Sequence, residues 1–337
     1  MTANNLIYYR PDRCGACGSS LKPWLSMVRD RVYGVDGDWN LHRCTDERCA
    51  CGYLDARLTP EQLRAFYATY STHSAPVLNA SGAKRMFRQA IEWALHRGLG
   101  YPCPDVPALA KFLGMVLRVI PWFRHAAYSR VFWLPHRLSA KLVEIGFGNA
   151  QTLLQLSGLG WKVEGIEFDS VCITKARKLG LQVGEGDFFA QDYADCSIDA
   201  VVGSHVIEHV PEPGKLIAEI YTKLAPRGQL VLVTPNGKSL GSSIFGRHWR
   251  GLEVPRHLTI QTPGSLVRYA EQAGFRKVQL FGTPRGGGIL QQSSQIRRAN
   301  HTSPTGWAAQ LGWALIASVI NAVAPRRSEE IVLFCEK

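Results

Sequence analysis

The chain has 337 residues, enough for one large domain with a smaller appendage or for two domains. Its hydrophobic share of 46% and charged share of 20% are ordinary for a soluble globular protein. The first residues contain neither the apolar run nor the small-residue cleavage site of a secretory signal. We therefore expect a cytoplasmic protein whose cysteines stay reduced.

The net charge of +12 is concentrated in two stretches without acidic residues, between Asp105 and Glu144 and between Glu271 and Glu329. Such stretches form either solvated basic faces or surfaces for an anionic partner, which would be a phosphorylated substrate, an acidic membrane or nucleic acid. Aromatic residues are not interleaved with the basic ones as they are in a groove for single strands. This disfavours nucleic acid as a partner.

Cysteines cluster at the front of the chain, where "CGAC" contains Cys14 and Cys17 and "CTDERCAC" contains Cys44, Cys49 and Cys51. Two close pairs separated by such a gap can converge on one tetrahedral zinc ion. The spacing leaves open whether Cys49 or Cys51 completes the site with Cys44. A site with four thiolates is closed, so zinc would be structural, and the alternative is a set of buried reduced cysteines.

A helical region is expected to follow this cysteine-rich segment. Thr59 is a candidate N-cap, Pro60 occupies the first helical position, and Gln62 completes a capping box. Residues 84–133 continue the helical pattern with breaks. We therefore divide the chain into a knuckle segment (1–58), a helical lead-in (59–138) and a main domain (139–337).

In the main domain, apolar runs alternate with helix-like stretches near 150–158, 170–179 and 213–224. The expected strands are 141–145, 162–167, 181–185, 198–203, 229–234, 276–281 and 330–336. This alternation predicts an α/β fold, a mostly parallel sheet with helices on both faces. Ligands of such sheets bind at the carboxyl ends of the strands.

The turn "EIGFGNA" lies at such an end. A dinucleotide fingerprint would need a third glycine at Gln151, which disfavours a nicotinamide oxidoreductase. The spacing acid-x-G-x-G-x-G fits better, with Gly146, Gly148 and a small residue, Ala150, in the last position. Glycines let the backbone approach a ligand, and Glu167 at the end of the next strand can accept both hydroxyls of a ribose.

These motifs resemble those of the class I S-adenosylmethionine-dependent methyltransferases, and "GSHVIEHVPEP" is similar to the fourth-strand segment of their ubiquinone-biosynthesis-like branch. The resemblance implies a Rossmann-like sheet of seven strands. It also implies that Glu167 holds the ribose and that Asp187, with the next backbone amide, faces the adenine. The expected cofactor-binding residues are Glu144, Gly146, Phe147, Gly148, Glu167, Phe168, Asp187, Phe188 and Ser204.

The segment "FGRHWRGLEVPRHLTIQTPGSLVRYAEQAGF" is similar to bacterial relatives that also carry a cysteine knuckle. In that pattern the zinc ligands are Cys14, Cys17, Cys44 and Cys49. Many such relatives look like glycan- or lipid-modifying enzymes, so the resemblance implies methyl transfer to a glycan, lipid-linked or other small-molecule acceptor, most simply at a hydroxyl group. The alternative is a degenerate methyltransferase fold that acts as a binding or regulatory protein.

A hydroxyl acceptor calls for a general base, and histidine titrates near neutral pH. The candidates are His205 and His209, just past the fourth strand, and His257 in "EVPRHL"; each could instead hold a loop by hydrogen bonding. Arg250 and Arg256 are either a clamp for an anionic acceptor group or solvated loop charge.

Residues 302–327 contain a long uncharged stretch followed by two arginines. Its polar residues fall on one side of a helix with small ones, which suits a helix packed on the sheet or lying at a bilayer surface. A spanning helix would conflict with the final strand predicted after it. Peripheral membrane contact through 306–323 is therefore one expectation, and the oligomeric state is left open.

Overall fold

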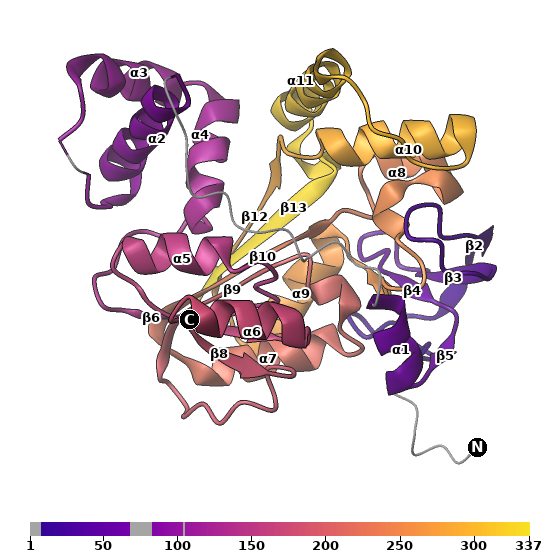
Figure 1. The fold of residues 1–337 in the computed structure, drawn as a ribbon. Helices are drawn as coiled ribbons and strands as arrows, with labels where there is room; N and C mark the ends of the chain where they lie inside the picture. The colour runs from indigo at the N-terminus through magenta and orange to yellow at the C-terminus, as the bar shows by residue number, and fades with distance from the viewer. Residues whose placement is uncertain (1–7, 68–82, 104) are drawn as a thin grey trace. The chain divides into compact units, whose positions relative to one another are not determined.

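The computed structural model describes residues 8–67, 83–103 and 105–337, which form two compact units (Figure 1). The first, which we call the cysteine unit, comprises Met1–Ser71, Gly203–Thr222 and Leu232–Lys337. The second comprises Thr72–Val202 and Lys223–Val231, and we call it the turn unit because it contains the glycine turn.

The largest sheet has seven strands in the order β12-β13-β10-β9-β6-β7-β8. Strands β6, β7 and β8 pair in parallel, whereas β12 runs antiparallel to β13. The strands are β6 (Lys141–Ile145), β7 (Lys162–Glu167), β8 (Gln182–Glu185), β9 (Ile198–Ser204), β10 (Leu224–Pro235), β12 (Lys277–Thr283) and β13 (Glu330–Glu336). This confirms the predicted α/β fold, and each expected strand is present.

Burial explains why these strands could be predicted from the sequence. A strand covered on both faces is apolar throughout, and in β6 the side chains of Leu142, Val143 and Ile145 are all buried. The parallel register pairs Glu144 with Gly165 and Ile145 with Ile166. The turn after β6 therefore lies beside the end of β7.

The helices of the turn unit are α2 (Ala83–Leu99), α3 (Ala108–Arg118), α4 (Pro121–Tyr128), α5 (Gln151–Gly158) and α6 (Ser170–Lys178). Helices α2, α3 and α4 pack on one another, and Figure 1 shows them as a separate cluster. The N-cap of α6 is Asp169, whose side chain accepts hydrogen bonds from Val171 N and Cys172 N. Residues 150–158 and 170–179 thus form helices close to the predicted bounds.

The cysteine unit contains a second sheet of four strands in the order β11-β4-β3-β2. These are β2 (Leu21–Val28), β3 (Trp39–Cys44), β4 (Gly52–Leu54) and β11 (Thr259–Ile260), while β1 (Tyr8–Tyr9) pairs with β5 (Arg57–Leu58). Strand β11 comes from the C-terminal part of the chain, so the knuckle segment shares its sheet with that part. Helix α1 (Pro60–Tyr67) starts with the predicted Thr59–Gln62 capping box, and residues 68–70 of the expected helix lie outside the described residues.

The other helices of this unit are α7 (Pro213–Lys223), α8 (Leu240–Phe245), α9 (Pro263–Ala273), α10 (Gly287–Ala299) and α11 (Trp307–Val323). Helix α9 has a Thr262 capping box at its start and Gly274 at its end, with φ +106°. Helix α11 contacts α10, as Figure 1 shows, so residues 302–327 do contain a packed helix. No helix among the described residues is both long and apolar enough to cross a bilayer.

Candidate active site

The glycine turn after β6 requires left-handed backbone. Gly146 and Gly148 have φ values of +68° and +54°, which a side chain would disfavour. Ala150 also adopts this conformation, with φ +60°, although an alanine pays about 1–2 kcal/mol there. The amide of Gly146 donates to the carbonyl of Ile166 at 2.8 Å, which holds the turn against the end of β7.

Glu167, the last residue of β7, forms hydrogen bonds with the turn after β6. One carboxylate oxygen accepts from the amide of Gly148 at 2.9 Å, and the other accepts from the amide of Phe168 at 2.8 Å. The second oxygen also accepts from the amide of Asp169 at 3.3 Å. Because a carboxylate oxygen has two lone pairs, the oxygen bonded to Gly148 can still accept a hydroxyl hydrogen. The predicted ribose-binding acid therefore lies where the turn would present a ligand to it.

Glu144 lies beneath this turn and is 4% exposed. Burial, reinforced by the charge of Glu167, raises the pKa of Glu144 to about 8. Its Oε2 atom has no hydrogen-bond partner within the described ranges. An enclosed oxygen without a partner is costly, so this atom suits a donor supplied by a bound molecule.

The three phenylalanines of the predicted cofactor site differ in their surroundings. The Phe147 ring packs over Gly165, where an added Cβ would lie 2.5 Å from the ring, and it belongs to the apolar core. Phe188 is also buried, whereas Phe168 is 73% exposed. Asp187 accepts a hydrogen bond at 2.8 Å from the amide three residues further on. The side chains of Phe147 and Phe188 thus fill the core, which leaves their backbones for any ligand contact.

His205 is clamped between two carboxylates in the cysteine unit. It follows Ser204, the half-buried last residue of β9. Its Nε2 lies 2.9 Å from Glu330 and its Nδ1 lies 3.4 Å from Glu208. Burial opposes its charge, but the bonds to Glu208 and Glu330 outweigh that effect and raise the pKa of His205 to about 10. The ring is therefore an imidazolium at pH 7.

Glu208 is the centre of this cluster and is 1% exposed. It accepts a hydrogen bond from the Thr234 hydroxyl at 2.9 Å. Desolvation alone would raise the pKa of Glu208, but the bond with His205 prevails and lowers it to about 2. The buried carboxylate is thus ionised at pH 7.

His209 and His257 have their tautomers fixed by carbonyl groups. His257 Nδ1 donates to the carbonyl of Gly251 at 2.8 Å, and His209 Nδ1 donates to that of Arg256 at 3.0 Å. Because a carbonyl can only accept, the neutral rings must carry their lone pair on Nε2. Burial lowers the pKa of His257 to about 4, and its side chain is 3% exposed, whereas His209 is only half-buried.

Glu208, His209 and His257 also bring one potential ligand atom each within 4.8 Å of one another. A carboxylate with two imidazoles is a donor set that divalent transition metals accept. The three histidines predicted from the sequence therefore gather around the carboxylate of Glu208.

Some residues of the cluster were missed by the sequence reasoning. Glu330 opens the final strand, Thr234 lies near the end of β10, and Glu253 approaches His257 Nε2 at 3.8 Å. The pair of acids Glu329–Glu330 at the start of an apolar strand was a signal, because buried strands rarely carry charges without partners.

Arg250 and Arg256 both form ion pairs, so the prediction of solvated loop charge was wrong. Arg256 is 0% exposed, pairs with Asp30 at 3.0 Å and lies 4.2 Å from the ring centroid of Tyr33. Arg250 pairs with Glu253. Both guanidinium groups thus pair with acids of the cysteine unit, and the anion clamp stays a prediction.

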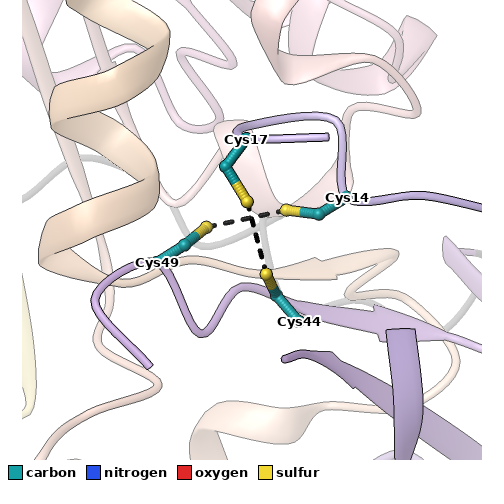
Figure 2. Close-up of side chains that lie close together, drawn as sticks. All are labelled: Cys14, Cys17, Cys44 and Cys49. Atoms are coloured by element: carbon teal, nitrogen blue, oxygen red, sulfur yellow. Dashed lines mark hydrogen bonds between the residues drawn. The ribbon is translucent and has the colours of Figure 1, made fainter. Parts of the chain in front are cut away.

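Four cysteine sulfurs converge on one point, as Figure 2 shows. Cys14 and Cys49 lie 3.6 Å apart, Cys17 and Cys44 lie 3.4 Å apart, and all four sulfurs lie within 4.8 Å of one another. Tetrahedral zinc with Zn–S bonds of about 2.3 Å requires sulfur separations of about 3.8 Å. The donor set and its spacing therefore fit zinc.

Cys51 lies outside this group. Its thiol is buried and faces the carbonyl of Gly52 at 3.7 Å. The chain reverses between Cys49 and Cys51 through Ala50, which has φ +49°. Cys49 and Cys51, two positions apart in the sequence, therefore have different surroundings. The fourth cysteine of the cluster is Cys49.

Comparisons with known proteins agree with this geometry. A family model described as a methyltransferase domain matches residues 123–280. A probable S-adenosylmethionine-dependent methyltransferase of Mycolicibacterium smegmatis is 25% identical over 63% of this chain and 86% of its own length. A ubiquinone biosynthesis O-methyltransferase of Thiobacillus denitrificans is 26% identical over 45% of this chain and 73% of its own.

Among solved structures, a phosphoethanolamine N-methyltransferase of Haemonchus contortus in complex with S-adenosyl-L-methionine aligns with a TM-score of 0.47 and 17% identity, over 91% of this chain and 70% of that one. The fold is the Rossmann-like α/β fold of S-adenosylmethionine-dependent methyltransferases. The family match and the curated relatives support S-adenosylmethionine-dependent methyl transfer as the activity.

Proposed function

We propose that this protein transfers a methyl group from S-adenosylmethionine to a hydroxyl group of a small-molecule, glycan or lipid-linked acceptor. The observation that carries the proposal is the position of Glu167, bonded to the amide of Gly148 at the carboxyl edge of β6 and β7. Relatives named as ubiquinone biosynthesis O-methyltransferases favour an oxygen acceptor.

The residues of the turn unit fit this cofactor. Glu167 would accept the ribose hydroxyls, Asp187 with the amide of Phe188 would face the adenine, and Glu144 would accept a donor at its partnerless oxygen. The cofactor supplies a methyl group already activated by its sulfonium. The chain must therefore align the acceptor and manage one proton.

For the proton, we assign His209 as the base. His205 is already protonated at pH 7 and cannot accept a proton, and His257 is enclosed. His209 is half-buried, with its Nδ1–H held by a carbonyl so that Nε2 keeps its lone pair. His205 and His257 would then act by positioning Glu208 and the surrounding loops.

For the cysteine cluster, we propose a structural zinc ion bound by Cys14, Cys17, Cys44 and Cys49. Nearby bonds tie this cluster to α9. The side-chain hydroxyl of Thr262 donates to the carbonyl of Cys49, and Arg268 pairs with Asp46 at 2.6 Å. Zinc would thus stabilise the cysteine unit without taking part in the chemistry.

The cofactor assignment is tested by calorimetric titration with S-adenosylmethionine and S-adenosylhomocysteine, with NAD as the control. We expect both sulfur nucleotides to bind and NAD to fail. Glu167→Ala should weaken binding at least about tenfold, or about 1.4 kcal/mol. The matched control is Glu164→Ala in the same strand, whose side chain pairs with Lys141 and should leave binding unchanged.

Folded protein that binds neither sulfur nucleotide would overturn the proposal and favour the degenerate fold as a binding or regulatory protein. Once an acceptor is found, His209→Gln should lower kcat while cofactor affinity is kept. An unchanged kcat would remove His209 as the base.

The zinc assignment is tested by metal analysis of protein purified without chelator. We expect one zinc per chain, its loss in Cys14→Ser, and its retention in Cys51→Ser, since Cys51 is buried outside the cluster. Loss in both variants, or no zinc in the parent protein, would contradict the assignment.

A further inference from the structure

Helix α11 carries its large apolar side chains on the outside. Five of them recur at every fourth position and are between 54% and 81% exposed. We call this set the outer stripe: Trp307, Leu311, Leu315, Val319 and Val323. A surface helix ordinarily turns such a stripe towards the core, so α11 is reversed.

The packed face of α11 explains the reversal. Its two buried residues are small or polar, Ala317 and Asn321, and the half-buried Trp313 and Ile320 flank them. The Asn321 side-chain oxygen accepts from the Ser328 hydroxyl at 2.9 Å. At Gly287 of α10, an added Cβ would lie 2.9 Å from the Cα of Ala314, so the two helices approach too closely for large side chains.

The outer stripe therefore cannot be buried by rotating the helix. Full burial of one such side chain yields about 1.5–3 kcal/mol, and a contiguous exposed set marks a surface that meets an apolar partner. In Figure 1, α11 lies beside α10, and none of the described helices and strands of the cysteine unit covers its outer side.

The charges around the stripe identify the partner. Exposed Arg326 and Arg327 follow the helix directly, and exposed Arg297 and Arg298 end α10. The sequence has no acidic residue from 272 to 328. If a second copy of this face were the partner, arginines would face arginines and repel one another. An anionic bilayer instead offers acyl chains for the stripe and phosphates for the arginines.

We propose that α11 binds an anionic phospholipid surface, lying flat with the outer stripe at the boundary of the acyl chains and the four arginines among the headgroups. A helix of 17 residues is about 26 Å long, which suits a position parallel to the bilayer plane. This binding is independent of the methyltransferase activity, so either can hold without the other.

The experiment is flotation of the full chain with vesicles of phosphatidylcholine alone and of phosphatidylcholine with phosphatidylglycerol. We expect flotation with the anionic vesicles and little with the neutral ones. The double variant Leu315→Glu/Val319→Glu should reduce flotation by about tenfold or more, because two inserted apolar side chains are lost. Arg326→Gln/Arg327→Gln should weaken only binding to the anionic vesicles.

The matched control is Phe112→Glu/Met115→Glu on α3, which changes two side chains of similar exposure in the turn unit. It should float as the parent does. Three outcomes would overturn the proposal: a parent protein that does not float, flotation that survives the α11 variant, or an equal loss in the α3 control. Self-association that the α11 variant abolishes, without vesicle binding, would identify a second copy as the partner instead.

Discussion

Glu144 in the turn unit and Glu208 in the cysteine unit are both enclosed carboxylates, 4% and 1% exposed, each close to a strand end of the same sheet. Burial dominates at Glu144, where the nearest charge is another acid, so its pKa rises to about 8. Glu208 is equally desolvated, but His205 bonds to it, and its pKa falls to about 2. Burial alone does not decide the charge of such a group; its partners do.

The largest effect is expected from breaking the cluster around Glu208. Glu208→Gln removes the charge that faces the His205 imidazolium and should lower the free energy of unfolding at pH 7 by about 2 kcal/mol. Urea denaturation measures the loss. The exposed Glu212, which pairs with Lys215, is the control, and Glu212→Gln should cost less than about 0.5 kcal/mol. An equal loss of unfolding free energy in the two variants would show that the Glu208 cluster contributes no more to stability than a surface ion pair.

Glu144→Gln should act in the opposite direction. Since the folded pKa of Glu144 lies above the unfolded one, its contribution to stability is full below about pH 4.5 and is lost as the pH rises through about 8. The variant has nothing to ionise, so it should be more stable than the parent at pH 8 by about 1–2 kcal/mol and similar to it at pH 5. Chemical denaturation at both pH values checks this, and a parent without pH dependence would contradict it.

A smaller effect should follow the titration of His205, because its side chain is 38% exposed and solvent screens the attraction. Its pKa is raised to about 10, so the stability that it contributes is present below about pH 6.5 and lost as the pH rises through 10. The stability difference between the parent and His205→Gln should therefore shrink from pH 6 to pH 10. A difference that grows with pH would show that the ring is neutral.

The smallest effect concerns the backbone of the turn. Ala150→Gly relieves the left-handed conformation, worth about 1–2 kcal/mol, but it removes a buried methyl worth about 0.8 kcal/mol and adds flexibility. The net change in unfolding free energy should stay within about 1 kcal/mol. A larger loss in urea denaturation would show that the Ala150 methyl matters more to packing than its conformation costs.

The sequence by itself determined the elements whose signals are local. The strands could be predicted because buried parallel strands are continuous apolar runs, and the turn because Gly146 and Gly148 are adjacent to one of them. Glu167 was found in the same way, one strand later. The two cysteine pairs could also be predicted, because the spacing of metal ligands within a knuckle is set by a few residues of backbone.

Only the tertiary structure decided features that depend on contacts distant in sequence. The charge of His205 depends on Glu208 nearby and also on Glu330, which lies 125 residues away. Arg256 pairs with Asp30, 226 residues away. Cys49 rather than Cys51 joins the cluster because of the backbone at Ala50. The sequence predicted the polar stripe of α11. That this side of the helix faces inward depends on the close approach of α11 to Gly287 of α10. Periodicity reports which residues share a face, whereas the partner of that face is chosen by packing and desolvation across the whole chain.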